Sequence, residues 1–282
     1  MSERNWIKAF IDRAIEEDVG DGDHSSLSCI PADARRKARL LVKEEGVLAG
    51  VEIAREVFDS VDPELKMEVF INDGSKVKVG EVAFTVEGPA QSILKAERLA
   101  LNLMQRMSGI ATRTAKVVEK LEGTSARVLD TRKTTPNLRY FEKLAVRIGG
   151  GVNHRFGLYD MIMLKDNHID YAGGIPEAMA KVRAYKAEKG IDIPVEVETR
   201  DMEEVKLVLE QEGVDRILLD NFTPAQIREA VDFIDGRLET EASGGITLDT
   251  VRAYGEAGVD YISMGALTHS VKSLDLSLKA ME

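Results

Sequence analysis

The sequence has very little cysteine and no long apolar run. Its single cysteine, Cys29, excludes an intramolecular disulfide and argues against an oxidising compartment. No apolar run approaches the roughly 18 residues that a membrane helix needs. The first ten residues, MSERNWIKAF, carry charges where a signal peptide has its apolar stretch. We therefore predict a cytoplasmic protein that does not cross a membrane.

Two kinds of binding signature are also missing. Neither histidine nor cysteine shows the close spacing that zinc sites require, although the chain has 4 histidines. The formal net charge is −11, and lysine and arginine form no extended basic face. These absences argue against a zinc protein and against a nucleic-acid partner.

The C-terminal part of the chain alternates short apolar runs with amphipathic segments. This alternation predicts βαβ units, and hence a parallel sheet in an α/β barrel or a doubly wound fold. The expected strands are 126–130, 161–164, 194–198, 216–220, 238–242 and 260–264. The expected helices are 138–148, 176–188, 202–211, 224–234 and 248–257.

The N-terminal part has a different texture. Helical periodicity predicts helices over 3–18, 51–60 and 90–121, with strands at 38–42 and 66–71. We expect Ser108-Gly109 to break or kink the longest helix. Residues 72–89 predict a strand-turn-strand unit that resembles carrier domains, but no modifiable lysine stands at its turn.

Polar residues follow each expected strand of the C-terminal part. They are Asp130 to Lys133, Lys165 to His168, Glu198, Asp220-Asn221, Ser243 to Gly245, and Gly265-Ala266. The carboxyl ends of parallel strands meet at one edge of a sheet, where barrel enzymes build their active sites. This pattern predicts an enzyme with its site at that edge.

Residues 131–155 form a positive island in an acidic chain. The stretch has one acidic residue, Glu142, and six basic residues, so its local charge is +5. The basic residues are Arg132, Lys133, Arg139, Lys143, Arg147 and Arg155. Such a cluster predicts an anion site.

The members of this island receive different interpretations. Arg132, Lys133 and Arg155 lie in expected loops and are functional candidates, whereas Arg139 and Lys143 fit a solvated helix face. Arg147 stays open. Among the histidines, His154 beside Arg155 is a better site candidate than His168, which could equally be structural.

Acidic residues could serve a metal or a sugar. Glu196 and Glu198 alternate, so they face the same side of one expected strand, and Asp220 ends the next. Carboxylates suit Mg²⁺ bridged to substrate phosphates. Alternatively, Glu198 and Asp220 hold ribose hydroxyls or stabilise a developing positive charge.

Glycine turns follow the last two expected strands. Gly244 and Gly245 precede a helix that we expect to begin at Thr247 or Leu248, and Gly265 lies in a second small-residue loop. Glycine lets the backbone approach an anion, and barrels commonly bind phosphate at these two loops. A plain turn is the alternative.

The segment DTRKTTPNLRYFEKLAVRIGGGVNHRFGLYDMIMLKDNHI, residues 130–169, is similar to the signature of the quinolinate phosphoribosyltransferase family. Other stretches resemble the family in order, among them EGVLAGVEIAREVF, ERLALNLMQRMSGIAT, VEVET, RILLDNF, ASGGITL and GVDYISMGALTHS. The N-terminal loop EEDVGDGDHSS departs from the family pattern at His24-Ser25.

This resemblance implies a fold and a reaction. The fold is an N-terminal α/β sandwich, residues 1–108, and a C-terminal incomplete α/β barrel of about six parallel strands, residues 109–269, with 270–282 packing back on the sandwich. The reaction transfers phosphoribosyl from phosphoribosyl pyrophosphate (PRPP) to quinolinate with loss of CO₂, a step of NAD biosynthesis that uses Mg²⁺. The family forms homodimers or larger assemblies with shared active sites.

The resemblance also implies roles for individual residues. Arg132, His154 and Arg155 hold the quinolinate carboxylates, with Lys165 close to both substrates. Arg98 reaches in from a second subunit. Lys133 and Lys165 face phosphate groups, and Glu198 and Asp220 handle ribose or Mg²⁺. Ser243, Gly244, Gly245 and Gly265 lie in the phosphate loops.

Three alternatives stay open. A nicotinate-type phosphoribosyltransferase does not decarboxylate, but nicotinate has one carboxylate and needs fewer cations than Arg98, Arg132, His154 and Arg155 provide. A related homologue associated with molybdate transport is the second. A carrier module built on 72–89 is the third, and it leaves the polar strand ends unexplained.

Overall fold

The computed structural model describes residues 3–281. The chain divides into two compact units. The N-terminal unit comprises residues up to 113 together with 140–149 and the segment from 271 onward. The barrel unit comprises residues 114–139 and 150–270. In the part of the chain that the structure describes, no helix is long and apolar enough to cross a membrane.

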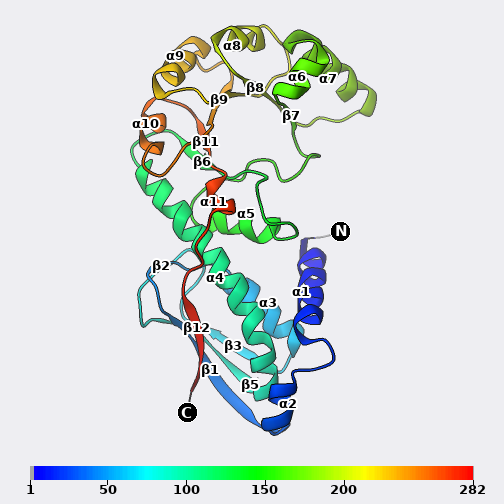
Figure 1. The fold of residues 1–282 in the computed structure, drawn as a ribbon, viewed down its shortest axis with the longest axis vertical. Coiled ribbons are helices and arrows are strands. Elements are labelled where there is room, and N and C mark those ends of the chain that lie inside the picture. The colour runs from blue at the N-terminus through cyan, green and yellow to red at the C-terminus, as the bar shows by residue number, and fades with distance from the viewer. Residues whose placement is uncertain (1–2, 282) are drawn as a thin grey trace. The chain divides into compact units, whose positions relative to one another are not determined.

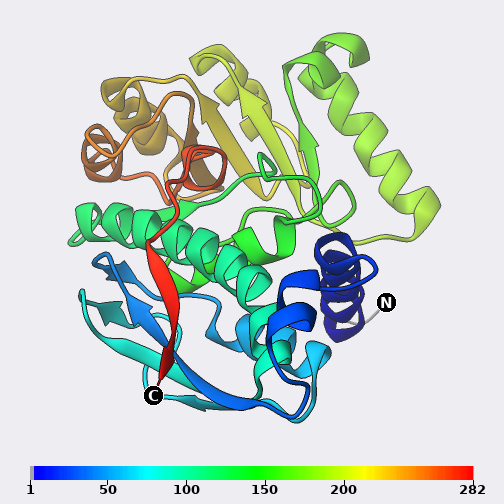
Figure 2. The same ribbon diagram turned by 60° about the horizontal axis from the view of Figure 1, so that its bottom comes forward.

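The N-terminal unit is built on a four-stranded antiparallel sheet in the order β12-β1-β5-β3. Its strands are β1 Arg35–Val42, β3 Lys66–Val69, β5 Val82–Pro89 and β12 Leu276–Met281. In Figure 2 the C-terminal strand β12, drawn in red, runs back to this sheet, where Leu40 pairs with Leu278. The helices are α1 Glu3–Val19, α2 His24–Cys29, α3 Val51–Val61, most of α4 Ala90–Lys120, and α5 Arg139–Ile148.

The strand-turn-strand unit predicted over 72–89 is confirmed as to its elements, but its two strands do not pair with each other. The two strands exist, but β4 Lys76–Val77 pairs with β2 Gly46–Val47, whereas β5 joins the four-stranded sheet. The strand β5 does not pair with β4 because both of its edges are occupied, by β1 on one side and by β3 on the other. The similarity to a carrier domain therefore does not extend to strand pairing.

The expectation of a break at Ser108-Gly109 is wrong, since α4 runs unbroken from Ala90 to Lys120, and the alternative of a kink there stays a prediction. The Ser108 hydroxyl accepts the Ala49 N–H at 2.9 Å, which anchors the helix to a loop of the same unit. A Cβ at Gly109 would overlap the Lys272 carbonyl oxygen. Both residues therefore make close packing contacts at this point of the helix.

Helix α5 corrects the interpretation of Lys143. Its apolar residues Phe141, Ala145 and Val146 are buried, and Phe141 packs on Phe10 of α1 with ring centroids 4.7 Å apart. The helix is covered on more than this face, so Glu142 and Lys143 are buried as well, at 1% and 2% exposure. Glu142 pairs with Arg106 of α4 at 2.6 Å. Lys143 therefore does not belong to a solvated face, because the helix has no such face at that position.

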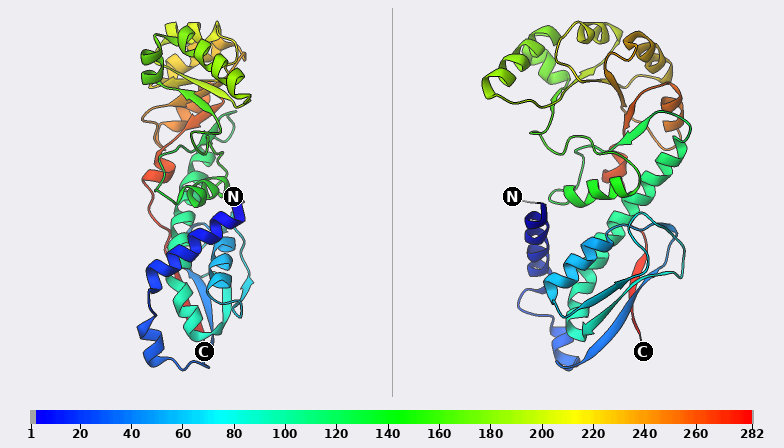
Figure 3. Two further views of the ribbon diagram at one scale, coloured as in Figure 1. Left: turned by 90° about the vertical axis from the view of Figure 1, so that its right-hand side faces the viewer. Right: turned by 180° about the vertical axis from the view of Figure 1, so that it is seen from behind.

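The barrel unit has a six-stranded sheet in the order β6-β11-β10-β9-β8-β7, and all its neighbours pair in parallel. The strands are β6 Arg127–Leu129, β7 Ile162–Leu164, β8 Val195–Thr199, β9 Arg216–Asp220, β10 Glu239–Ser243 and β11 Tyr261–Ser263. The helices are α6 Asp166–Ala172, α7 Ile175–Lys189, α8 Met202–Leu209, α9 Pro224–Ile234, α10 Val251–Glu256 and α11 Ala266–His269. Helices α6 to α10 lie on the outer side of the curved sheet (Figures 1 and 3). The predicted incomplete α/β barrel of about six parallel strands is thus confirmed.

Strand register decides which side chains face the inside of the barrel. Glu196 lies opposite Arg216, and Glu198 lies opposite Leu218. Leu218 in turn lies opposite Glu241. Because side chains alternate along a strand, these positions share the concave side of the sheet. Glu196 and Glu198 therefore face the same side, as their spacing predicts.

Candidate active site

A cavity of about 320 Å³ opens at the carboxyl ends of the barrel strands. It is lined by Thr131, Arg132, Lys133, His154, Arg155, Met163, Lys165, Leu218, Glu241, Ser243 and Ser263. Every one of these residues belongs to the barrel unit. Strands β7, β9, β10 and β11, the loops after β6 and before β7, and Lys165 after β7 contribute, so the cavity brings together six of the twelve residues that the sequence predicts for the site.

Two loops place Arg132, Lys133 and Arg155, which we call the mouth cations. The Lys133 N–H donates to the Thr131 hydroxyl at 3.0 Å, and the Thr268 hydroxyl donates to the Lys133 carbonyl at 2.8 Å. The Arg155 guanidinium donates to the Met161 carbonyl at 3.1 Å. Buried Asp130, at the end of β6, accepts the His154 N–H at 2.8 Å and so ties the second loop to the first.

Among the described residues, no carboxylate lies within ion-pair distance of a mouth cation. Arg132 and Arg155 line the same cavity, and burial and the Arg132 charge lower the pKa of Arg155, whereas the charges of Glu196 and Asp160 act to raise it. Like charges gathered without carboxylates are costly in the absence of an anion. The geometry therefore fits an anionic ligand with more than one charged group.

Arg139 does not lie on a solvated face as expected. It is half-buried, and its guanidinium donates to the Phe156 carbonyl and to the Thr134 hydroxyl, both at 3.0 Å. These bonds brace the two loops that carry the mouth cations. The planar fork of arginine allows one side chain to hold both loops.

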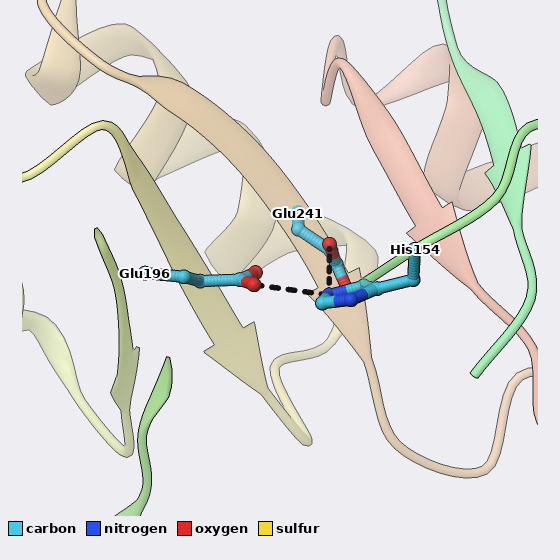
Figure 4. A group of neighbouring side chains, drawn as sticks. All are labelled: His154, Glu196 and Glu241. Carbon is cyan, nitrogen blue, oxygen red and sulfur yellow. Dashed lines mark ion pairs between the residues drawn. The ribbon is translucent and has the colours of Figure 1, made fainter. Parts of the chain in front are cut away.

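His154 sits between two buried carboxylates (Figure 4). Its Nε2 lies 2.9 Å from Glu196 Oε2 and 3.4 Å from Glu241 Oε2. Its Nδ1 accepts the Arg155 N–H at 2.7 Å. Glu196 and Glu241 are both fully buried, on β8 and β10.

The protons of this group follow from its geometry. Burial lowers the pKa of His154, but the two carboxylates outweigh burial and raise it to about 9. Burial and the charge of Glu241 raise the pKa of Glu196 to about 7. The bond from the Arg155 N–H requires an unprotonated Nδ1 and therefore opposes the second ring proton that the two carboxylates favour. When Glu196 is protonated, one carboxylate charge is removed and the ring can be neutral, with its proton on Nε2. The group then carries any further proton on Glu196.

A second set of charges extends from buried Glu241 to the first residues of β6, β9, β10 and β11, where Arg127 and Glu239 are exposed. Arg216 pairs with Glu239 at 2.8 Å and with Glu241 at 3.2 Å. The Tyr261 hydroxyl donates to Glu239 at 3.2 Å, and the guanidinium groups of Arg127 and Arg216 lie 4.9 and 4.1 Å from the centre of its ring. We call these five residues the interior network.

His154, Glu196 and Glu241 offer three ligand atoms within 4.8 Å of one another, which is close enough for a metal ion. However, Glu241 Oε2, the oxygen nearest His154, also contacts the Arg216 guanidinium. A guanidinium beside a metal ion would repel it. The donor set is therefore better suited to a shared proton than to a cation.

The acids at the mouth are arranged differently. Lys165 pairs with Glu198 at 3.1 Å, and Glu198 also accepts the Asp166 N–H at 3.4 Å. Burial first, and then the charge of Glu198, raise the pKa of Asp220. Two carboxylates that repel each other at the ends of adjacent strands are a suitable pair for a divalent cation.

The glycine loop after β10 is shaped by contact with Asn221. Gly244 has φ +100°, and a Cβ there would overlap the Asn221 side-chain oxygen. The Asn221 N–H donates to the Ser243 carbonyl at 2.9 Å, which draws the two loops together. The helix expected at Thr247 or Leu248 begins instead at Val251, so the helix start lies further from the glycine turn than predicted. Gly265 follows β11, and a Cβ there would lie 3.0 Å from Lys133 Cδ.

Two predicted residues lie apart from this group. Arg98 belongs to the N-terminal unit, where it is exposed on α4. His168 accepts the Lys165 N–H at 3.0 Å through Nδ1, so its observed contact is a cap of α6.

Sequence reasoning missed the structural roles of Asp130, Arg216 and Glu241. The alternation of Glu239 and Glu241 in ETEAS resembles that of Glu196 and Glu198 and was the available signal. It was difficult to use because the partner charge, Arg216, begins a different strand.

Comparison with known proteins agrees with this architecture. Residues 23–108 match the family model described as quinolinate phosphoribosyl transferase, N-terminal domain. Residues 110–279 match the model of the C-terminal domain of the same family.

Curated relatives and solved structures point the same way. The chain is 50% identical over 288 residues to nicotinate-nucleotide pyrophosphorylase [carboxylating], chloroplastic, of Oryza sativa, covering 97% of this chain and 77% of the relative. It is 44% identical to the probable enzyme of that name from Bacillus subtilis, covering 96% and 92%. The NadC structure from Streptococcus pyogenes superposes with a TM-score of 0.93 at 41% identity, covering 100% and 99%.

Proposed function

Since the chain belongs to the quinolinate phosphoribosyltransferase family, we propose that it transfers phosphoribosyl from PRPP to quinolinate with loss of CO₂. The products are nicotinate mononucleotide and pyrophosphate. The observation that carries this proposal is the group of mouth cations, which line a cavity without carboxylate partners among the described residues. Such a cavity suits two anionic substrates.

Quinolinate has two carboxylates on adjacent ring carbons. Arg132 and Arg155 line the same cavity, and each guanidinium can hold a carboxylate through two parallel hydrogen bonds. Lys165 lines the same cavity and supplies a further charge. His154 also lines the cavity, but both of its ring nitrogens already contact protein groups.

PRPP requires donors for its phosphates. Lys133 lies beside Gly265, where a Cβ would crowd the lysine side chain, and a glycine at this place lets the backbone approach an anion. Ser243, Gly244 and Gly245 form the neighbouring loop, which we assign to the 5′-phosphate. The two glycine loops therefore share the phosphate groups with Lys133.

Glu198 and Asp220 are the proposed Mg²⁺ ligands. Their mutual repulsion, expressed in the raised pKa of Asp220, fits a divalent cation between them. Mg²⁺, when bound, would neutralise charge on the pyrophosphate. The same carboxylates face the ribose, where they stabilise positive charge that develops at C1.

The proposed reaction forms two bonds and breaks two. The arginines hold quinolinate with its ring nitrogen towards ribose C1, so that the nitrogen lone pair forms the N–C1 bond while the C1–O bond to pyrophosphate breaks. The positive ring nitrogen then accepts the electron pair released when the 2-carboxylate leaves as CO₂. A proton from solvent takes the place of the carboxylate on the ring carbon.

The assembly is proposed as a homodimer or a larger homo-oligomer. Arg98 is exposed on α4 of the N-terminal unit, and the family resemblance assigns it to the site of a second copy. An arginine supplied in this way would add a charge to the quinolinate pocket of its neighbour.

The direct test uses quinolinate labelled in its carboxyl groups. Purified protein with PRPP and Mg²⁺ should release labelled CO₂ in proportion to pyrophosphate. Turnover of nicotinate without CO₂ would favour the non-decarboxylating alternative, and turnover of neither would overturn the proposal. A chelator should abolish release if Mg²⁺ is required.

Sharing of the site is tested by mixing two inactive variants, Arg98→Ala and Arg132→Ala. If Arg98 acts across an interface, hybrid dimers contain one intact site and recover part of the activity. Absence of recovery after subunit exchange has been demonstrated would contradict a shared site.

A further inference from the structure

We propose that Arg139 is a positioning residue that sets the separation of Arg132 and Arg155, and that it thereby favours a ligand with two adjacent carboxylates. The cavity is lined by Arg132 and Arg155 but not by Arg139, so Arg139 acts through the two loops that it joins. The inference rests on the proposed function for the identity of the ligand, but the contacts that carry it are present in the protein alone.

The two arginines of the pocket stand on different loops. Arg132 lies in the segment 130–138 after β6, and Arg155 lies in the segment 153–161 before β7. Neither segment contains a helix or a strand, so contacts with side chains fix its position. At their base the segments are joined through Asp130, whose carboxylate accepts a main-chain N–H of the second loop at 2.8 Å. The separation of the two guanidinium groups depends on what joins the loops beyond that point.

The Arg139 guanidinium reaches both loops. Its Nε donates to the Thr134 hydroxyl of the first loop, and its Nη1 donates to the Phe156 carbonyl of the second, both at 3.0 Å. A longer contact runs from Nη2 to the Arg132 carbonyl at 3.5 Å. All three acceptors are neutral oxygens, so these contacts fix geometry and leave the charge of Arg139 in place. Because the guanidinium is planar and its donors point in fixed directions, one side chain sets the orientation of one loop against the other.

On each loop the acceptor lies close to a cation of the pocket. Phe156 follows Arg155 directly, and its own N–H donates to the Asp160 carboxylate at 2.6 Å. The Phe156 main chain is therefore held through both its carbonyl and its N–H. On the first loop, the Arg132 carbonyl also accepts the Thr134 N–H at 2.9 Å. Loss of the bridging guanidinium would therefore release the chain within two residues of both cations.

A ligand with two adjacent carboxylates depends on this separation, and a ligand with one does not. Quinolinate presents both charges at a fixed spacing on a rigid ring, so both guanidinium groups must be aligned at once. Each bidentate contact weakens when its guanidinium is turned out of line. A monocarboxylate needs one guanidinium, and either loop can supply it. Fixing the loops before the ligand arrives therefore strengthens binding of the dicarboxylate selectively.

The test compares quinolinate with nicotinate and picolinate, two pyridine monocarboxylates that each retain one of its carboxylates. Their dissociation constants are measured by titration calorimetry, with the monocarboxylates in competition with quinolinate. Arg139→Gln should raise the quinolinate Kd about 30-fold and the monocarboxylate Kd less than about three-fold. An equal rise for all three ligands would mean that Arg139 supports the pocket without setting its specificity, and would overturn the inference.

A double-mutant cycle on quinolinate alone gives an independent measurement. In the Arg132→Ala background only one of the two guanidinium groups is left to align. Arg139→Gln should therefore raise the quinolinate Kd less than about three-fold in that background. The same fold-change in both backgrounds would show that Arg132 and Arg139 act independently, which contradicts a role of Arg139 in placing the pair.

Two variants separate the shape of the guanidinium from its charge. Arg139→Lys keeps the charge but has a single amino group, which cannot span both loops, so its quinolinate Kd should stay within about three-fold of that of Arg139→Gln. Thr134→Val removes one acceptor and should raise the quinolinate Kd about three-fold. Full recovery of binding in Arg139→Lys would mean that the charge alone matters, and the inference would then be wrong.

Arg228→Gln is the matched control. Arg228 is exposed on α9 and also donates to a main-chain carbonyl, that of Glu256, at 2.8 Å. It lies outside the cavity, so its substitution should leave the Kd of every ligand unchanged. A rise in the quinolinate Kd as large as in Arg139→Gln would mean that loss of any such contact disturbs the pocket, and would also overturn the inference.

A measurement without substrate keeps the inference separate from the proposed function. Hydrogen exchange of the main-chain N–H groups reports local opening of the loops. Arg139→Gln should speed exchange in both 132–135 and 155–160, whereas Arg228→Gln should speed it in neither. Faster exchange in one loop only, or in neither, would rule out the bridging role. Failure of the wild-type protein to bind quinolinate would instead overturn the proposed function, and the exchange data would then decide whether Arg139 joins the loops.

Discussion

The mouth of the barrel and its interior contain the same kinds of charged side chain in opposite arrangements. In the interior network, Arg216 contacts the carboxylates of Glu239 and Glu241. The Tyr261 hydroxyl also donates to Glu239. At the mouth, Arg132, Lys133 and Arg155 face a cavity, and no carboxylate among the described residues pairs with them. Charges that the fold satisfies internally lie deep in the barrel, and charges left for a ligand lie at the strand ends.

The difference has an energetic consequence. A buried ion pair adds little net stability but is costly to break, because the remaining partner stays buried without compensation. A cation kept for a ligand lowers the stability of the free protein slightly and contributes to binding instead. Substitutions in the two regions should therefore be separable by whether they change unfolding or substrate binding.

The largest effect is expected at the mouth. Arg155→Ala should lower kcat/KM for quinolinate about 1,000-fold, or about 4 kcal/mol, because it removes two charge-assisted hydrogen bonds. Its thermal unfolding should change little, since Arg155 has no ion-pair partner among the described residues. Steady-state kinetics and calorimetry together check both parts. A large drop in stability without a kinetic defect would break the contrast between mouth and interior.

In the interior network, a substitution should change the stability of the fold more than substrate binding. Arg216→Met should lower the free energy of unfolding by about 3 kcal/mol, since Glu241 remains buried without its partner. The matched control is Arg252→Met, which removes an exposed pair with Glu256 and should cost about 0.5 kcal/mol. Denaturant unfolding of the three proteins measures the difference. Similar values for the two variants would indicate that burial of the network is not decisive.

An intermediate effect is expected at the glycine loop. Gly244→Ala should cost about 2 kcal/mol and raise the PRPP KM, because a Cβ would overlap Asn221 and the backbone has φ +100°. Gly245 has φ +62°, and no atom lies near the Cβ that Gly245→Ala would add. This substitution should therefore lower the free energy of unfolding by only about 1 kcal/mol. Chemical unfolding and PRPP kinetics test the pair. Equal losses would assign the whole effect to backbone conformation.

The smallest effect is one of ionic strength. Raising salt from about 0.05 to 0.3 M shortens the screening length below about 10 Å and should raise the PRPP KM several-fold. The Arg216–Glu241 pair is buried, although Glu239 is half exposed, so the melting temperature should shift by no more than a few degrees. Kinetics and melting curves over the same salt series provide the comparison. A melting temperature as salt-sensitive as KM would mean that solvent reaches the interior network.

The sequence predicted the parallel sheet and the carboxyl-end site because both depend on local periodicity and on strand direction. It predicted Arg132, Lys133 and Arg155 because they stand in loops. It could not predict burial of Lys143, since that depends on which helices cover α5. The sequence also could not predict the contact between Glu241 and His154. This contact depends on the register of β10 and on the position of a loop that lies far earlier in the chain. The close contact of Gly109 with Lys272 could not be predicted either, because the two residues are distant in sequence.

The last strands of the chain have a consequence for folding kinetics. Arg127 of β6 meets Tyr261 of β11 across 134 residues, and β1 meets β12 across a still longer span. Pairings of such long range close large loops and are slow to form. During synthesis, both sheets stay incomplete until their C-terminal strands have left the ribosome. Until then β1 and β6 each present an open edge, so shortening the chain by a few residues at its C-terminus should slow folding far more than an equal deletion in α7.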